Sequence, residues 1–298
     1  VGSEMCIRDS NTPGNKTLFS KSVARTLLAK IYAEKPLRDY TKVIQYCDEV
    51  KADGFDLVDD FSDLFGMNAA GTDAKMRNTK ESILEAQFTS GAGNWCTWMF
   101  GRDLVNWNNN FTWAKWVTPS RDLISAFKQE GDEVRFKESI VYYDCNWSNY
   151  YPSDNYPFMY KCRSANSSII KYRYADVLLL KAEALIMQDT PDLEGAADII
   201  DEVRDRAKLG ALPTSVRSNK NVLLNALLKE RRLELAFEGQ RWFDLVRLDK
   251  VEEVMNAVYA KDSGRKAQIY TFDKNSYRLP IPQSVIDAND KIHQNPGY

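Results

Sequence analysis

Histidine is almost absent from this sequence: His293, close to the C-terminus, is the only one among 298 residues. A Ser-His-Asp or Cys-His nucleophile system would have to use that residue, and no GxSxG elbow lies near it. The GxxxxGK(S/T) loop of nucleotide sites and the GxGxxG fingerprint of dinucleotide sites are also missing. These absences argue against the familiar hydrolases and nucleotide-dependent enzymes. We predict that the chain is not an enzyme and has neither catalytic residues nor a cofactor.

Patterns typical of metal sites and of nucleic-acid surfaces are missing as well. The five cysteines lie far apart without a CxxC pair, so neither a zinc site nor a disulfide framework is expected. The 40 basic and 42 acidic residues leave a net charge of −2, and no basic stripe is visible. This balance argues against a nucleic-acid partner. We expect most of the charged side chains to form a solvated surface.

Long apolar runs are absent too. No stretch of about 18 apolar residues could form a membrane-spanning helix, and no signal peptide is visible. The chain begins with Val1, and residues 1–10, VGSEMCIRDS, do not continue into the pattern that follows. We interpret residues 1–10 as a non-native segment and exclude them from the fold. The missing signal therefore says nothing about location.

What the sequence does contain is helical periodicity, in three pairs of segments. Apolar residues recur at a spacing close to 3.6 residues, and Pro36, Pro191 and Gly239 separate the members of each pair. Each pair has about the length of a tetratricopeptide repeat, and such hairpins must stack to bury their apolar faces. The pairs are Leu18–Glu34 with Arg38–Lys51, Tyr172–Gln188 with Leu193–Gly210, and Asn221–Leu235 with Arg241–Leu248.

The region between the first two hairpins, residues 55–168, has a different composition. Six of the 7 tryptophans lie there, and eight of the 15 tyrosines fall between Tyr142 and Tyr174. Aromatic rings offer apolar faces to sugar rings, and Asn amides offer a donor and an acceptor to hydroxyl groups. The alternative interpretation is that an irregular region uses large aromatic side chains only to fill its core. The residues predicted to contact a ligand are Trp95, Trp98, Trp107, Asn109, Trp113 and Trp116.

Two sets of carboxylates could suggest acid–base chemistry, but a structural role fits both better. Glu230 and Glu234 are four residues apart and share one helix face, next to several arginines. Asp176 and Glu183 are seven apart, so they also share a face and do not oppose one another across a cleft. We expect both sets to stabilise the helices.

Three segments give the chain a specific likeness. These are KYRYADVLLLKAEALI at Lys171–Ile186, ERRLELAFEGQRWFDLVRL at Glu230–Leu248, and YRLPIPQSVIDANDKIHQNPGY at Tyr277–Tyr298. All three resemble signature segments of the SusD/RagB family, and the hairpin Leu18–Gly54 resembles a fourth more weakly. Val285 stands where the family usually has Glu, and Asp290 where it often has Pro.

The resemblance implies a mainly α, SusD-like fold for residues 11–298. Residues 11–54 and 169–260 would form a tetratricopeptide-like scaffold, residues 55–168 the irregular, aromatic-rich ligand-binding region, and residues 261–298 a tail packed on the scaffold. Family members are usually longer, so we expect an N-terminal third, with its lipid anchor, to be missing from this chain.

The resemblance also implies a function. Such proteins sit on the outer face of the outer membrane as lipoproteins, bind oligosaccharides or polysaccharides, and deliver them to a TonB-dependent, SusC-like transporter. The identity of the glycan stays open. A helical-repeat scaffold for protein interaction without glycan binding is the alternative, and a glycoside hydrolase ranks last because no carboxylate pair can be nominated.

Overall fold

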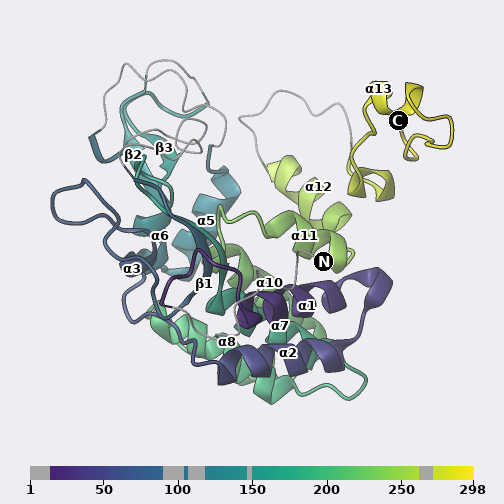
Figure 1. Ribbon diagram of the computed structural model, residues 1–298, viewed down its shortest axis with the longest axis horizontal. Helices are drawn as coiled ribbons and strands as arrows, with labels where there is room; N and C mark the ends of the chain where they lie inside the picture. Colours follow the sequence, from purple (N-terminus) through teal and green to yellow (C-terminus); the bar gives the residue numbers. More distant parts are fainter. Residues whose placement is uncertain (1–13, 90–103, 107–117, 146–149, 262–270) are drawn as a thin grey trace. The chain divides into compact units, whose positions relative to one another are not determined.

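The computed structural model describes residues 14–89, 104–106, 118–145, 150–261 and 271–298 (Figure 1). The chain separates into two compact units, Val1–Gln240 and Arg241–Tyr298, which are described here one at a time. Among the described residues, no helix combines the length and the apolar character that crossing a bilayer requires.

The first unit is built mainly from helices. Polar side chains cap several of them: Ser20, Asp39, Ser120 and Asp192 each accept a hydrogen bond from a first-turn backbone N–H. Its helices are α1 (Lys21–Ala33), η1 (Lys35–Leu37), α2 (Tyr40–Ala52), α3 (Ser62–Phe65), η2 (Leu104–Asn106), α5 (Arg121–Glu130), α6 (Glu133–Ser139), α7 (Tyr174–Met187), α8 (Leu193–Arg206), α9 (Thr214–Arg217) and α10 (Lys220–Glu234).

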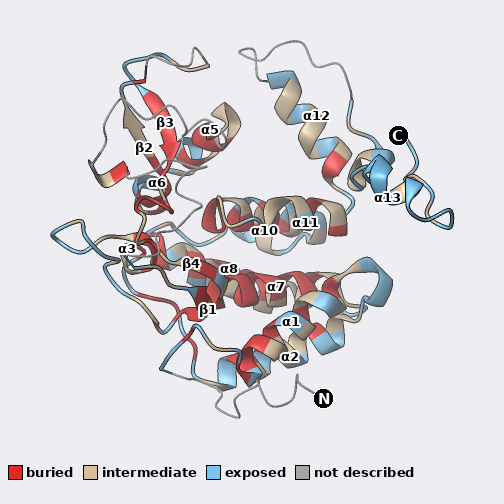
Figure 2. Ribbon diagram, turned by 45° about the horizontal axis from the view of Figure 1, so that its top comes forward, coloured by how far each residue is buried: buried red, intermediate tan, exposed pale blue. Residues whose placement is uncertain are grey.

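The first two predicted hairpins form and stack, whereas the third, α10 with the helix that follows Gly239, spans the two units and stays a prediction. Helix α1 packs against α2, α2 against α7, α7 against α8, and α10 against both α7 and α8. Helix α7 is buried along most of its length, so it forms the centre of this layer (Figure 2). Its core includes Leu179 and Ile186 of α7 and Ile200 of α8, all with no measurable exposure. The mainly α fold with tetratricopeptide-like hairpins is confirmed.

Two short antiparallel strand pairs accompany the helices. Strand β1 (Ser82–Ala86) pairs with β4 (Ile169–Arg173), and β2 (Ile140–Tyr143) pairs with β3 (Tyr156–Met159). Strand β4 runs straight into α7, which begins at Tyr174. The helix predicted from Tyr172 therefore starts two residues late, because Tyr172 and Arg173 pair with β1.

The second unit contains α11 (Arg241–Arg247), α12 (Val251–Lys261), η3 (Lys274–Tyr277) and α13 (Gln283–Asp287). Asn256 of α12 exchanges hydrogen bonds with the backbone of Phe272, and Gln294 does the same with Ile281. The predicted packing of residues 261–298 on the scaffold concerns the relation between the two units and stays a prediction.

Candidate functional site

An open hollow of about 460 Å³ lies in the first unit between α5, β2 and the segment that precedes β3. This volume is in the range of small-ligand sites. Its walls combine aromatic rings with neutral amide and hydroxyl groups and two cations. The lining residues are Arg121, Ile124, Ser125, Lys128, Gln129, Tyr142, Tyr151, Pro152 and Asn155.

One face of α5 forms a wall of the hollow. The lining positions of α5 follow one another at helical spacing, from Arg121 through Ile124 and Ser125 to Lys128 and Gln129. The helix begins at the Ser120 cap, and Gly131 ends it in the left-handed conformation with φ of +70°. Both ends of the wall are therefore fixed by local sequence.

An apolar cluster supports the floor of the hollow. Leu123, Ile124 and Phe127 of α5 pack with Ile140 of β2 and with Leu233 of α10, and the rings of Tyr142 and Tyr151 pack against this same cluster. Ala236 and Phe237, just after α10, complete it. The segment ERRLELAFEG thus contributes apolar side chains directly beneath the candidate site.

Arg121 and the tyrosines hold one another in place at the rim. The guanidinium carbon of Arg121 lies 4.1 Å from the ring centroid of Tyr150 and 4.8 Å from that of Tyr151, and Arg121 donates a hydrogen bond to the Tyr150 carbonyl. The Tyr151 hydroxyl donates to the Pro119 carbonyl at 2.7 Å. Stacked and hydrogen-bonded side chains of this kind form a preorganised surface.

Ion pairs of its two acidic residues connect α5 to helices α8 and α10 of the scaffold. Asp122 pairs with Arg232 of α10 at 2.7 Å. Glu130 pairs with Arg204 of α8 at 2.7 Å and also with Lys229 of α10. The two acidic residues of α5 are therefore paired with scaffold cations, and neither is among the residues that line the hollow.

A buried arginine fastens α6, which leads into β2, to the same scaffold. Arg135 has no exposed side-chain area, and it pairs with Asp132 at 2.5 Å, with Glu230 at 2.5 Å and with Glu234 at 3.0 Å. Glu230 and Glu234 do share one helix face, as their spacing predicts, and both accept from Arg135 Nη1. This contact joins positions that are 95 and 99 residues apart.

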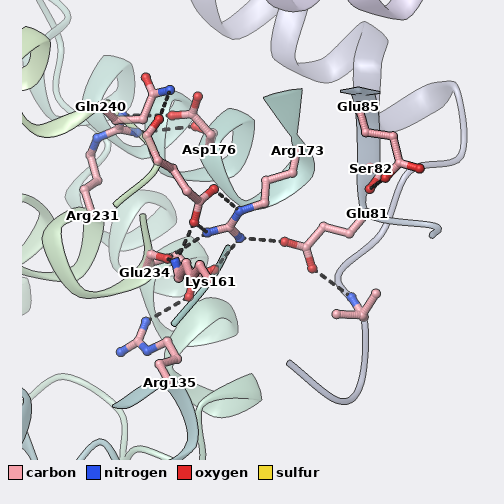
Figure 3. Close-up of polar contacts among 12 residues, drawn as sticks. Glu81, Ser82, Glu85, Arg135, Lys161, Arg173, Asp176, Arg231, Glu234 and Gln240 are labelled. Carbon is pink, nitrogen blue, oxygen red and sulfur yellow. Dashed lines mark hydrogen bonds and ion pairs between the residues drawn. The ribbon is translucent and has the colours of Figure 1, made fainter. Parts of the chain in front are cut away.

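Glu234 also pairs with two further arginines, of which Figure 3 labels Arg173. Arg173, the last residue of β4, pairs with Glu234 at 2.5 Å and with Glu81 at 2.7 Å. Arg206, at the end of α8, pairs with Glu234 and, at 3.0 Å, with Glu81. Burial alone would raise the pKa of Glu234, but the three arginines hold it well below its usual value.

The turn after α10 places another acid in this network. Phe237 has a φ of +66°, a conformation that costs energy for a residue with a Cβ atom. Glu238 then accepts from Arg173 Nε at 2.7 Å and from Lys161 Nζ at 2.6 Å. Lys161 also donates to the Glu234 carbonyl at 2.8 Å. Burial lowers the pKa of Lys161 to about 8 in spite of Glu238.

Lys161→Met should change how stability depends on pH. An unfolded lysine has a pKa of about 10.4, so between about pH 8 and about pH 10.4 the unfolded chain binds this proton more than the folded chain does. Lys161 therefore makes the free energy of unfolding of the parent rise with pH in that window, by about 2–3 kcal/mol. The variant should lack this rise.

The measurement is urea unfolding of both proteins from pH 7 to pH 10.5, approximately the window given by the two pKa values. The difference between parent and variant cancels the other groups that titrate in this range. Lys171→Met, at the exposed position of β4, controls for the loss of one surface charge. Parallel pH curves for parent and Lys161→Met would show that burial does not depress this pKa.

A second buried charge cluster lies at the start of α7. Asp176 pairs with Lys30 of α1 at 2.6 Å and with Arg231 of α10 at 2.8 Å, and Lys30 also donates to Gln240 at 2.9 Å. Burial opposes the ionised form, but Lys30 and Arg231 lower the pKa of Asp176. Asp176 therefore joins three helices and does not face an open cleft, in keeping with the structural role expected for it.

None of the residues predicted to contact a ligand can be placed. Trp95, Trp98, Trp107, Asn109, Trp113 and Trp116 all lie outside the described residues. The stretch nevertheless ends shortly before Thr118, whose hydroxyl lies 3.2 Å from the Tyr156 hydroxyl. Among the residues that are described, no group of three His, Cys, Asp or Glu side chains is arranged to hold a metal ion.

Sequence reasoning missed the residues of the hollow, although two signals pointed toward them. Tyr142 and Tyr151 belong to the tyrosine-rich segment that was noted from composition. Pro119, a residue type common at helix starts, comes just before α5, and the lining residues of α5 recur at helical spacing. Nothing local to either segment indicates that they face one another.

Known proteins share both sequence and fold with this chain. A model of the SusD family matches residues 155–298. SusD-like protein P38 of Formosa agariphila is 43% identical over 99 residues, which cover 31% of this chain and 19% of that protein. SusD-like protein P2 of the same organism is 36% identical over 143 residues, covering 46% of this chain and 27% of that protein.

A solved structure has the same fold over almost the whole chain. Surface glycan-binding protein A from Bacteroides thetaiotaomicron, in complex with laminarihexaose, superposes with a TM-score of 0.71 at 20% identity. The match covers 97% of this chain and 66% of that one. The present chain thus spans about two thirds of the length of that structure, and its alignments span about a quarter or less of the two curated relatives.

Proposed function

We propose that the chain is a member of the SusD/RagB family, whose model matches residues 155–298, and that it binds an oligosaccharide or polysaccharide at the cell surface. We further propose that the full-length protein is a lipid-anchored protein on the outer face of the outer membrane. There it would deliver the glycan to a TonB-dependent, SusC-like transporter. The transporter and the location rest on the family relationship alone.

The observation that supports glycan binding is the composition of the hollow. Tyr142 and Tyr151 supply aromatic faces for sugar rings, and Ser125, Gln129 and Asn155 supply donors and acceptors for hydroxyl groups. The hollow is open, which suits a long chain that enters and leaves at both ends. Each aromatic contact contributes about 1 kcal/mol, so we expect micromolar to millimolar affinity.

The tryptophan prediction stays part of this proposal. We propose that some of Trp95, Trp98, Trp107, Trp113 and Trp116, together with Asn109, extend the aromatic surface that the described tyrosines provide. Single replacement of each tryptophan by Ala, with binding measured on folded variants, tests this extension. If all five bind glycan as the parent does, the ligand contacts lie elsewhere.

Tyr142→Ala should weaken glycan binding about fivefold or more, because one ring face is lost. Tyr46→Ala is the matched control, since Tyr46 is also half-buried but stacks on Tyr32 in the first hairpin, 5.9 Å between centroids. Isothermal titration or affinity electrophoresis with laminarihexaose and a panel of polysaccharides measures the effect. Equal losses in both variants would contradict a site in the hollow.

We also propose that the protein binds its glycan without cleaving it. Incubation with each bound polysaccharide should release no reducing ends. Sustained release that a single carboxylate substitution abolishes would contradict this part of the proposal. Failure to bind any glycan, with capture of a protein ligand by the helical hairpins, would support the alternative of an interaction scaffold.

A further inference from the structure

The ionisable groups around the hollow are distributed unequally. Of the residues that the structure describes, Arg121 and Lys128 line it, and no Asp or Glu does. The whole chain has 40 basic and 42 acidic residues, so a positive site is not a consequence of overall composition. Both cations can donate hydrogen bonds to neutral hydroxyl groups, but only an anionic group on the ligand would form a charge-assisted contact with them.

The helix geometry of α5 produces this inequality. Arg121 and Lys128 are seven residues apart and share the face that lines the hollow. Asp122 lies next to Gln129 on the helix surface but is not a lining residue, and it pairs with Arg232 of α10; Glu130 lies opposite Arg121 and pairs with Arg204 of α8 and Lys229 of α10. The acids of α5 therefore do not cancel the positive charge at the hollow.

The two cations are suited to different tasks. Arg121 is stacked on Tyr150 and Tyr151, so its charge is held at a fixed place on the rim. Lys128 is exposed and has no ion-pair partner among the described residues. A long flexible side chain of this kind can reach an anionic group at several positions along a bound sugar chain.

Resting on the proposed function, we propose that the hollow selects acidic glycans, whose sugar units carry a carboxylate or a sulfate group. The tyrosine rings bind the sugar ring, the amides bind hydroxyl groups, and Arg121 and Lys128 bind the anionic substituent. A charge-assisted contact of this kind is about twice as strong as a neutral one.

The test uses sugars that differ only in charge. One pair is a hexamer of galacturonic acid and its carboxyl-reduced, neutral form. The second pair is a hexasaccharide of κ-carrageenan and its desulfated form, and laminarihexaose is an independent neutral probe. At least one acidic member should bind about tenfold more tightly than its neutral partner, and the pair that does so separates carboxylate from sulfate recognition.

Charge reversal at Lys128 and a change in salt concentration test whether the preference for acidic sugars arises at the hollow. Lys128→Glu should weaken binding of the preferred acidic hexamer about tenfold, and its effect on the neutral hexamers should be much smaller. Lys137→Glu is the control, because Lys137 is an exposed lysine of α6 outside the lining. Raising the salt from about 0.05 M to about 0.5 M should weaken only the acidic ligands.

The outcomes separate this inference from the function on which it rests. If acidic and neutral members bind equally and Tyr142→Ala weakens both, the preference for acidic glycans is wrong while glycan binding stands. If Lys128→Glu and Lys137→Glu behave alike, the charge does not act at the hollow, and the inference fails. If none of the five sugars binds, glycan binding in the hollow itself is contradicted.

Discussion

Arg135→Met should lower the free energy of unfolding by about 3–5 kcal/mol. The side chain has no exposed area and compensates Asp132, Glu230 and Glu234. Met fills much of the same volume, so the loss should come mainly from buried carboxylates that keep their charge and lose their partner. Glu230 would retain only Arg204, at 3.4 Å. Equilibrium unfolding in urea with a probe of secondary structure measures the change.

Arg217→Met is the matched control for that experiment. Arg217 also contacts three carboxylates, but Glu194 and Asp198 are 73% and 69% exposed, so water screens most of the interaction. We expect a loss within about 1 kcal/mol. Similar losses in the two variants would mean that burial does not decide the strength of these pairs, and the supporting role given to Arg135 would be wrong.

Leu179→Ala should destabilise the stacked hairpins by about 2–5 kcal/mol. Leu179 lies on α7 with no exposed area, in the core that α7 shares with α2 and α8. Because neighbouring helices pack on several sides, the cavity cannot close easily. Both the transferred apolar surface and the cavity contribute to the loss.

Leu37→Ala makes the same chemical change at a residue that is 56% exposed. Its effect should be about 0.5 kcal/mol or less, as is usual for surface positions. Thermal and urea unfolding of both variants measure the difference. If Leu179→Ala unfolds with the parent's midpoint, the hairpins do not depend on a common core, and the stacked arrangement is contradicted.

The scaffold could be predicted because its signals are local. Apolar residues at helical spacing, with Pro36 and Pro191 between the helices, indicate α1, α2, α7 and α8 without knowledge of any distant contact. Several boundaries differ by two to four residues, and the one at Tyr172 has a clear cause, the pairing of β4 with a strand some ninety residues earlier. No local pattern distinguishes the last residues of that strand from the first turn of α7.

The buried charges could not be predicted in the same way. Most charged residues were expected at a solvated surface, but Arg135, Arg173 and Arg206 are buried and paired with carboxylates. A buried charge needs partners, and apart from Asp132 the carboxylate partners of Arg135 and Arg173 lie 61 to 99 residues away. The spacing of Glu230 and Glu234 reveals a shared face but not the arginine that it meets.

The candidate site also combines features that local sequence predicts with contacts that it does not. The amphipathic face of α5 can be found from sequence, and so can the high content of tyrosine after Tyr142. Their meeting across one hollow depends on the β2–β3 pair, whose strands IVYY and YPFM lack the alternation of apolar and polar residues that marks a half-buried strand. The ion pairs of Asp122 and Glu130 with cations of α8 and α10 cannot be found from the sequence of α5 alone.

The sharing of Glu234 among Arg135, Arg173 and Arg206 limits the order in which mutations can accumulate. A change at Glu234 alone would remove one carboxylate partner from each of three buried arginines. Loss of one arginine leaves Glu234 with two arginine partners. Substitutions at these four positions should therefore be epistatic, with an arginine replaced before Glu234. In an alignment of relatives, the four positions should covary as a group and not as independent pairs.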